Sequence, residues 1–237
     1  MESNPKEALH NRQSQKSVVN LSAIIDHPIY LPFLRFATTR HQIVSEMIGD
    51  QTYNSVLELG CGRGEILRKK VKCFGQYTGL DLSSHQLLQI PEDIGKIPTV
   101  KIQECDLDQP LNFPDDSFDL TFSVSTIEYI YNPIDFVREI FRTLKPGGTL
   151  ILHTVNLAFF PRRWQLLLGK LPTFNATAGW QGGTLHNFTY PTLGRLVRET
   201  GFQITEKRCS GLLPNFRMWW PNFLAADIIY RCQKPKS

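Results

Sequence analysis

The sequence feature that most constrains the fold is the stretch from Val56 to Glu65, V-L-E-L-G-C-G-R-G-E. A short apolar run, which predicts a buried strand, leads into three glycines at every second position and then into a helical pattern. The chain must turn sharply between strand and helix, and glycine allows backbone angles and close approaches that a Cβ atom forbids. Free N–H groups of such a turn would face a ligand above the strand end. The stretch therefore predicts a loop that binds a cofactor.

The spacing of these glycines separates two classes of cofactor. Dinucleotide-binding loops place the third glycine five residues after the first, whereas Gly64 lies four residues after Gly60, and Glu58 comes just before the loop. This arrangement resembles the first motif, E/D-x-G-x-G-x-G, of the class I S-adenosylmethionine-dependent methyltransferases. The alternatives are a nicotinamide dehydrogenase, for which the spacing is too short, and a tight turn without a ligand. The resemblance implies that the cofactor contacts Glu58, Gly60, Cys61, Gly62 and Gly64.

Acids follow at two further strand ends. Asp81 ends a second predicted strand, Gln76 to Asp81, and lies 19 residues after Gly62, where a doubly wound fold places the acid that receives ribose hydroxyls. A carboxylate can accept both hydroxyl protons at once. After a third predicted strand, Thr99 to Gln103, the resemblance implies that Asp106 accepts from the adenine amine. The alternative for both acids is an ordinary turn or capping role. The remaining residues predicted to contact the cofactor are Leu82, Cys105, Leu107 and Ser123.

The other phrases shared with this family are structural. Phe113 to Leu120, F-P-D-D-S-F-D-L, has turn chemistry and opens a fourth strand, whose end at Ser123 to Thr126 is expected to face the cofactor. Pro133 to Leu144 carries the apolar stripe of a helix and stops at L-K-P-G-G, after which Thr149 to Thr154 predicts a fifth strand. The five ordered matches between Val56 and Val155 identify the chain as a member of the methyltransferase family.

The C-terminal third completes the predicted sheet. Tyr190 to Glu199 predicts a helix, Phe202 to Arg208 a sixth strand, and Phe223 to Cys232 a seventh. The resemblance implies that the last two strands form the antiparallel edge pair usual in the family. The expected fold is α/β: a doubly wound, Rossmann-like, seven-stranded sheet, mostly parallel with an antiparallel last strand.

The domain organisation follows from length and polarity. Residues 1–20 are polar and predict a mobile N-terminal arm. Residues 21–237 predict a single methyltransferase domain, because the length suffices for one sizeable α/β domain and hardly for two. A helix over Arg40 to Ile48 is expected to pack against the sheet, with a place over the cofactor as the alternative.

Residues 156–190 depart from a bare doubly wound domain. They are rich in Phe, Trp, Pro, Gly and Arg, and an insertion after the fifth strand hangs over the strand ends, where ligands bind. The insertion predicts a lid that selects the acceptor, with a contact for a partner protein or for a membrane surface as alternatives. Its W-Q-L-L-L phrase, with Trp220 to Leu224, looks more loosely like MetW-like proteins. That likeness implies an alternative function, a cofactor-binding partner subunit with little catalysis of its own.

Composition narrows the class of protein. The net charge of +4 comes without a dense basic cluster, so nucleic acid is not an expected partner. The five scattered cysteines contain no C-x-x-C pair, so neither a metal site nor a disulfide framework is expected, and the environment is predicted to be reducing and cytoplasmic. No signal peptide is expected from the polar first residues, and no apolar run approaches the roughly 20 residues that cross a bilayer.

The chemistry of the donor explains why the catalytic residues stay unassigned. A sulfonium is a strong leaving group, so in-line methyl transfer needs positioning and water exclusion before it needs a catalytic side chain. A base is required only for an acceptor that arrives protonated. The family often has an acid followed by His where this chain has Glu128 and Tyr129. Together with His153 and His186 these residues are candidates by position, each with a structural role as the alternative. The expected acceptor is a small molecule, and the expected product is S-adenosylhomocysteine.

Overall fold

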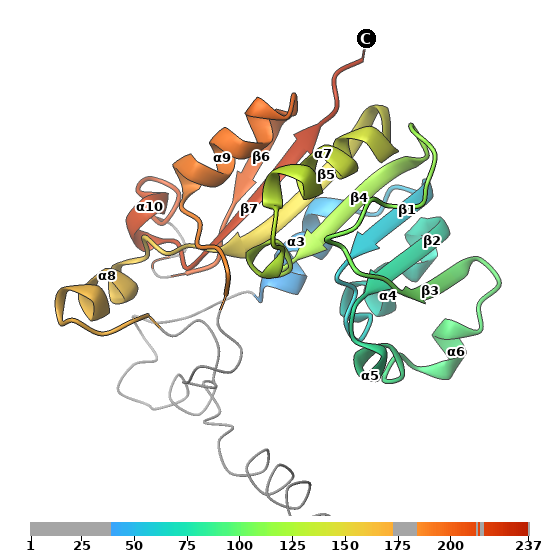
Figure 1. Cartoon of the computed structure of the whole chain (residues 1–237), viewed down its shortest axis with the longest axis horizontal. Helices are drawn as coiled ribbons and strands as arrows, with labels where there is room; N and C mark the ends of the chain where they lie inside the picture. Colours follow the sequence, from blue (N-terminus) through green and yellow to red (C-terminus); the bar gives the residue numbers. More distant parts are fainter. Residues whose placement is uncertain (1–38, 173–183, 212, 214–215, 237) are drawn as a thin grey trace, which may run out of the picture.

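Seven strands form one sheet in the order β3-β2-β1-β4-β5-β7-β6 (Figure 1). The computed structural model describes residues 39–172, 184–211, 213 and 216–236, so the predicted arm at residues 1–20 lies outside the described residues. The strands are Tyr53–Leu59 (β1), Phe74–Asp81 (β2), Val100–Glu104 (β3), Phe118–Val124 (β4), Leu144–Val155 (β5), Gln203–Arg208 (β6) and Asp227–Gln233 (β7). β1 to β5 run parallel, which confirms the predicted doubly wound, Rossmann-like α/β fold.

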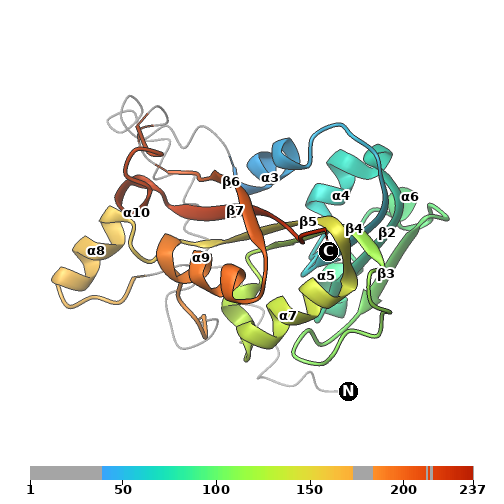
Figure 2. The same ribbon diagram turned by 90° about the horizontal axis from the view of Figure 1, so that it is seen from above.

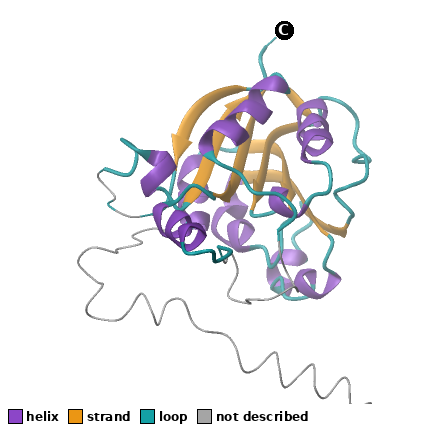
Figure 3. Ribbon diagram, turned by 60° about the vertical axis from the view of Figure 1, so that its left-hand side comes forward, coloured by secondary structure: helices purple, strands orange, loops and turns teal. Residues whose placement is uncertain are grey.

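Helices cover both faces of the sheet (Figures 2 and 3). The helical segments are α3 (Arg40–Ile48), α4 (Glu65–Lys70), η1 (Val71–Cys73), α5 (Ser84–Leu87), α6 (Glu92–Gly95), η2 (Ile127–Tyr129), α7 (Pro133–Thr143), α8 (Phe160–Leu167), α9 (Tyr190–Glu199) and α10 (Pro221–Leu224). Successive side chains of a strand point to opposite faces. Val56 of β1 therefore joins the core under α3 and α4, whereas Leu57 joins the core under α7 and α9. A strand covered on both faces carries apolar residues on both, as Val56 and Leu57 of β1 show.

The last strand runs antiparallel and forms the edge pair with β6, as predicted, but its start differs from the prediction. β7 pairs antiparallel with both β5 and β6, so β7 lies inside the sheet and β6 forms the edge. The strand predicted from Phe223 begins only at Asp227, because Pro221 to Leu224 form α10. Proline is preorganised for the first turn of a helix, and a short apolar run does not by itself distinguish strand from helix.

The fifth strand begins at Leu144, five residues before the predicted start at Thr149. Leu144 already pairs with Phe118, and the register shifts before Thr149 pairs with Leu120. The strand therefore absorbs the Pro-Gly-Gly turn as a bulge. Within that bulge, the Lys145 ammonium donates to Asp119 Oδ1 at 2.8 Å and ties the starts of β4 and β5 together.

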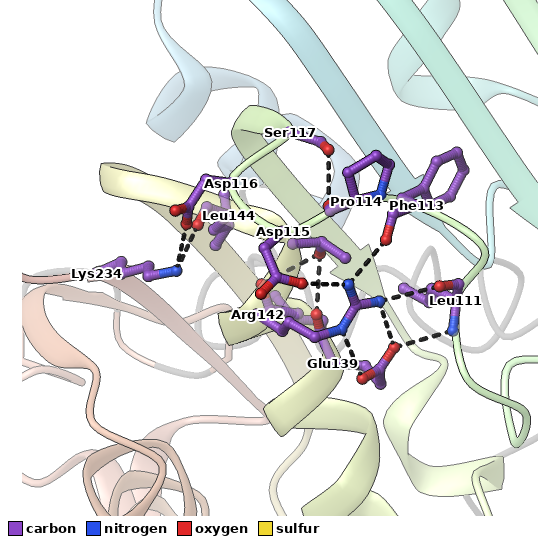
Figure 4. Close-up of polar contacts among 12 residues, drawn as sticks. Leu111, Phe113, Pro114, Asp115, Asp116, Ser117, Glu139, Arg142, Leu144 and Lys234 are labelled. Atoms are coloured by element: carbon purple, nitrogen blue, oxygen red, sulfur yellow. Dashed lines mark hydrogen bonds and ion pairs between the residues drawn. The ribbon is translucent and has the colours of Figure 1, made fainter.

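The segment that leads into β4 is held by one arginine of α7 (Figure 4). Arg142 Nη1 donates to Asp115 Oδ1 at 2.7 Å and to the Phe113 carbonyl at 2.8 Å. Its Nη2 donates to the Leu111 carbonyl at 2.9 Å and to Glu139 Oε2 at 2.8 Å. A planar guanidinium with five donors suits this clamp, which a lysine ammonium would not reproduce. The F-P-D-D-S-F-D-L phrase thus has the structural role that the sequence predicts.

Three further properties of the described chain complete the description of the fold. All five cysteines carry free thiols. Within the described ranges, none of the helices combines the length and the apolar character that a membrane span needs. The described residues also contain no group of three or more His, Cys, Asp or Glu side chains arranged to share a metal ion.

Candidate functional site

A cavity of about 510 Å³ opens at the carboxyl ends of β1, β2 and β4. Doubly wound sheets bind ligands at this edge. Eight of the eleven residues predicted to contact a cofactor line the cavity: Glu58, Gly60, Cys61, Gly62, Asp81, Leu82, Asp106 and Leu107. The fold therefore brings together loops that follow three different strands, at the place that the sequence predicts.

The other three predicted residues lie outside the cavity lining and have visible structural contacts. Gly64 precedes α4 with φ +69°, a conformation that favours glycine. Ser123 is fully buried, and its hydroxyl donates to the Leu59 carbonyl at 2.9 Å, which holds β4 to β1. Cys105 Sγ lies 3.7 Å from the Asp106 carbonyl oxygen. A cofactor contact for these three residues stays a prediction.

The cavity is also lined by residues that the prediction omitted. Two of them, Arg40 and His41, form the first turn of α3. Burial lowers the pKa of His41, and the Glu65 carboxylate, 3.3 Å from Nδ1, offsets this only in part. The other omitted residues are Arg63, Glu65, Gln86, Asp108 and Ile130. Val124, Ser125 and Thr126 belong to the strand end expected to face the cofactor, and Tyr129 is one of the catalytic candidates.

The glycine loop combines a strained backbone with open space. Gly60 has φ +76° and Gly62 has φ +52°, both in the left-handed region. A Cβ atom on Gly60 would lie 2.0 Å from Thr126 Oγ1, so no other residue fits there. A Cβ atom on Gly62 would meet only the flexible end of Gln86, at 3.1 Å. Gly60 thus permits the turn, and Gly62 keeps the cavity open.

The amide groups of this loop bind mostly within the protein. The N–H groups of Gly60 and Cys61 donate to the Leu80 carbonyl at 2.8 and 3.0 Å, and the Gly62 N–H donates to Asp81 Oδ2 at 2.8 Å. The expectation that loop amides face a ligand is therefore wrong for these three groups. A phosphate-binding loop needs free amides. A loop with its amides occupied suits a ligand that needs room and carries no phosphate there.

Asp81 is held by one amide on each carboxylate oxygen. The Gly62 N–H donates to Oδ2 and the Ser83 N–H donates to Oδ1, both at 2.8 Å. An ionised carboxylate has about four acceptor positions, so each oxygen keeps one for a further donor. The two amides thus orient the carboxylate and leave it able to accept from two hydroxyl groups.

Glu58 is the buried acid of the site, with 3% of its surface exposed. The Tyr77 hydroxyl donates to its Oε2. Burial raises the pKa of Glu58 to about 8, although the Tyr77 hydrogen bond acts in the opposite direction. The carboxyl group is therefore mostly protonated near pH 7, and a cation in the cavity would favour its ionised form.

A row of polar side chains leads from the cavity into the core. Ser125 lines the cavity with φ +57°, and its Oγ lies 3.2 Å from Nδ1 of the fully buried His153. Nε2 of His153 lies 3.7 Å from Asp227 Oδ2, an ion-pair distance beyond that of a hydrogen bond, and Oδ2 accepts from the Ser210 hydroxyl. Burial would raise the pKa of Asp227, but the neighbouring His153 and Ser210 lower it to about 2. A proton on Nε2, facing this carboxylate, leaves Nδ1 to accept from Ser125.

The remaining catalytic candidates lie in different surroundings. Tyr129 lines the cavity. Glu128 is buried, accepts from the Thr154 hydroxyl at 3.0 Å and lies outside the lining, and burial raises its pKa. Its backbone carbonyl accepts from the N–H groups of Leu185 and His186 at 2.8 and 3.0 Å. These contacts give Glu128 and the 184–188 segment a structural connection.

The described part of the 156–190 insertion contributes no residue to the cavity lining. α8 lies beside α10, away from β1 and β2, whose carboxyl ends border the cavity (Figure 1). Phe174 and Trp180, which the lid prediction includes, fall in residues 173–183, outside the described residues. The lid stays a prediction.

Known proteins resemble this chain in sequence and in fold. A family model described as a methyltransferase domain matches residues 57–152. A probable S-adenosylmethionine-dependent methyltransferase of Mycolicibacterium smegmatis is 30% identical over 201 residues, which cover 80% of this chain and 76% of that protein. The chain belongs to the S-adenosylmethionine-dependent methyltransferases. The looser likeness of this methyltransferase to MetW-like proteins stays a prediction.

In two further comparisons, one relative shares the fold at low sequence identity and another shares sequence over less than half of this chain. A solved S-adenosylmethionine-dependent methyltransferase from Mesorhizobium loti aligns with a TM-score of 0.63 at 18% identity, over 84% of this chain and 99% of that one. The 2-methyl-6-phytyl-1,4-hydroquinone methyltransferase of Synechocystis sp. is 34% identical over 103 residues, 43% of this chain. The match spans only 32% of that relative, so the activity in its name does not transfer to this methyltransferase.

The cavity fits the cofactor that the family implies. Gly62 leaves space where a Cβ atom would stand, Asp81 has two acceptor positions free, and Glu58 offers a carboxyl group to a cation. The occupied loop amides agree with a cofactor that has no phosphate to bind. These properties favour S-adenosylmethionine over a dinucleotide.

Binding of S-adenosylmethionine is expected to tighten with pH between about pH 6 and about pH 7.5, by up to about tenfold per pH unit. The positively charged ligand favours ionised Glu58, whose pKa of about 8 in the free protein makes ionisation less costly as the pH rises. Calorimetry in two buffers of different ionisation enthalpy would measure the proton released at pH 7. In Glu58→Gln, neither proton release nor the pH dependence should remain. A pH-independent wild-type affinity would contradict the assignment.

Proposed function

We propose that this methyltransferase transfers a methyl group to a small-molecule acceptor whose reactive hydroxyl or carboxylic acid arrives protonated. The observation that carries this proposal is the line from Ser125 through His153 to Asp227, which begins on the cavity and ends on a largely buried carboxylate. When bound, S-adenosylmethionine would supply a methyl group on a sulfonium, a strong leaving group that an in-line nucleophile displaces. The residues of the chain then have two tasks: to hold the cofactor and to take up the acceptor proton.

The cofactor side rests on the strand-end acids and the glycine loop. Asp81 would accept from the two ribose hydroxyls, while the Gly62 and Ser83 amides hold its carboxylate in place. Asp106 and Leu107, which line the cavity beyond β3, would accept from the adenine amine and pack on the ring. Glu58 would balance the positive charge of the ligand.

The acceptor side rests on proton transfer through Ser125. As the acceptor oxygen loses its proton to Ser125 Oγ, the Ser125 hydroxyl proton passes to Nδ1 of His153, 3.2 Å away. The Asp227 carboxylate then stabilises the positively charged ring. Such a relay leaves Ser125 unchanged and places the proton on a buried base. A positioned general base contributes about 10²- to 10⁴-fold to the rate.

Asp81→Ala is expected to weaken S-adenosylmethionine binding about ten- to hundredfold, because charge-assisted hydrogen bonds contribute about 1.5–3 kcal/mol. The same change leaves the Gly62 and Ser83 amides without their acceptor, so a lower melting temperature should accompany the loss. Calorimetry measures the affinity. Ser83→Ala, which removes only the cap of α5, is the control and should bind normally. Unchanged affinity in Asp81→Ala would end the ribose assignment.

One experiment tests the proposed function as a whole. Mass spectrometry of the purified protein would identify a retained ligand, and a screen with isotopically labelled S-adenosylmethionine would then find the acceptor. Methyl transfer to a hydroxyl or carboxyl compound is the expected result. Cofactor binding without turnover on any acceptor would instead favour the alternative, a cofactor-binding partner subunit. Transfer only to an amine or thiol would contradict the proposed acceptor class.

A further inference from the structure

Large apolar side chains lie exposed where α8 and α10 meet. Three of them, Leu167, Leu171 and Trp219, have 75%, 86% and 86% of their surface exposed. We call the whole set the aromatic–leucine surface; its members are Phe160, Trp164, Leu166, Leu167, Leu168, Leu171, Phe216, Met218, Trp219 and Trp220. Single exposed apolar residues are common, but a contiguous set of this kind marks an interaction site.

The apolar stripe of α8 faces away from the core. Phe160, Trp164, Leu167 and Leu168 follow the spacing of one helical face, which in most surface helices packs inward. In α8 none of the eight residues is buried. The helix therefore has an amphipathic pattern whose apolar side stays largely exposed in the described part of the chain, apart from the contact of Phe160 with Phe223.

α8 and α10 form one continuous surface. The rings of Phe160 and Phe223 lie 4.8 Å apart, and Trp220 stacks on Phe223 at 4.6 Å. Below them, Asn156 Nδ2 donates to the carbonyls of Pro221 and Ala225, at 3.3 and 2.8 Å. Both helices lie together at one end of the molecule in two perpendicular views (Figures 1 and 2).

The two chain segments that form this surface carry basic residues and no acid, and the acids Glu46 and Glu206 come near it only at the pocket that Met218 also lines. Residues 156–198 and 207–226 contain no Asp or Glu. Arg163 and Lys170 belong to α8 and the turn after it, and Arg217 lies beside α10. The Arg163 guanidinium lies 5.9 Å from the Phe223 ring centre, so positive charge borders the aromatic cluster directly. An occupant of this surface must accept apolar side chains and carry negative charge.

We propose that the aromatic–leucine surface docks this methyltransferase on an anionic phospholipid bilayer. Tryptophan is favoured at the level of the lipid headgroups, leucine and phenylalanine enter the acyl boundary, and arginine and lysine attract anionic lipid. The absence of any acid from both segments distinguishes this surface from a protein contact that pairs charges of both signs.

Docking at this place keeps the cavity near the membrane. β5 leads into α8, and α10 leads into β7, whose first residue Asp227 pairs with Val155 at the end of β5. The neighbouring strand β4 ends at Val124, which lines the cavity together with the following Ser125. Both the surface and the cavity therefore lie on the side of the sheet where the parallel strands have their carboxyl ends.

The test is binding of the full-length protein to lipid vesicles of defined composition. Vesicles of phosphatidylcholine and phosphatidylglycerol in equal parts should bind at least about tenfold more protein than phosphatidylcholine alone, and high salt should reverse this. Three of the four tryptophans, Trp164, Trp219 and Trp220, lie in the surface, so tryptophan fluorescence should shift to the blue on binding. Brominated lipid should quench it.

Matched variants distinguish binding through this surface from non-specific adsorption of other exposed apolar residues. Trp164→Ser with Trp219→Ser should lower vesicle binding at least about tenfold. Leu88→Ser with Tyr131→Ser removes side chains that are 84% and 81% exposed elsewhere, and binding should not change. Leu167→Ser with Leu171→Ser keeps every tryptophan and should weaken the fluorescence shift.

Three results would overturn the proposal. The first is that the protein does not bind anionic vesicles. The second is that the Leu88/Tyr131 control loses as much binding as the Trp164/Trp219 variant. The third is that sedimentation velocity shows a dimer of the wild-type protein and a monomer of the Trp164/Trp219 variant. The last result would assign the surface to a second copy of the chain. Melting temperatures of all variants would confirm folding, which changes at such exposed positions should leave intact.

Discussion

Gly62→Val is expected to abolish S-adenosylmethionine binding, with an affinity loss of more than about hundredfold. A side chain at Gly62 would point into the cavity, where a Cβ atom meets only the end of Gln86. The position has φ +52°, which a β-branched residue rarely adopts, so the loop and the Asp81 carboxylate bonded to it would also shift. Calorimetry measures the affinity, and circular dichroism confirms that the domain still folds.

Gly49→Val is the matched control for this change. Gly49 has φ +74°, and a Cβ atom there would meet nothing within 4 Å. Gly49→Val should lose at least as much stability as Gly62→Val, because ψ −164° places Gly49 in a backbone region that is essentially confined to glycine, but only Gly62→Val should lose the ligand. If Gly62→Val binds normally, the loop is a turn without a role in binding. If both variants lose binding, strain rather than lost space is the cause.

The parts of the site that the sequence predicts are those set by local chain geometry. A strand that ends in glycines and passes into a helix must turn at the sheet edge, so the places of Glu58 and Gly62 follow from the strand before them. The same holds for Asp81 and Asp106, each placed by the end of its own strand. Parallel strands then bring these residues to one edge, whatever the sequence between them.

The features of the site that the sequence does not predict depend on tertiary packing. Arg40 and His41 reach the cavity because α3 packs across β5 and α4, and no local pattern specifies the edge over which its first turn lies. Ser125 has φ +57°, which its residue type does not indicate. The loop amides of Gly60 and Cys61 were expected to be free, but they bind the Leu80 carbonyl of the neighbouring strand. That contact forms only when β1 and β2 pair.

The C-terminal third of the chain shows a second limit of prediction from the sequence. The apolar stretch around Phe223 matches a strand as well as a helix, and the contacts that decide for α10 come from Asn156 and Phe160, more than sixty residues earlier. Likewise, the aromatic content of α8 is plain in the sequence, but its outward direction is not. The sequence therefore favours a lid, with a contact for a partner or for a membrane as alternatives, because it does not specify the direction in which the insertion faces.

His153→Gln is expected to lower the methyl-transfer rate constant about 10²- to 10⁴-fold while leaving S-adenosylmethionine affinity near the wild-type value. His153 is fully buried and lies outside the cavity lining, so it reaches an acceptor only through Ser125. Ser125→Ala should lower the rate similarly, because it interrupts the same proton path. His85→Gln, a change at an exposed histidine of α5, is the control and should keep full activity.

A merely structural role for His153 is distinguished by the acidity of the acceptor. If His153 removes a proton, an analogue of the acceptor that is already ionised at the assay pH should react with His153→Gln at close to the wild-type rate. If His153 only supports the fold, both acceptors should lose rate equally. Nitrogen-15 spectroscopy of histidine-labelled protein gives a test that needs no acceptor. The relay requires a proton on Nε2, toward Asp227, and an unprotonated Nδ1 toward Ser125. The opposite tautomer would leave no base at the end of the path, and the acceptor would then have to enter the cavity already ionised.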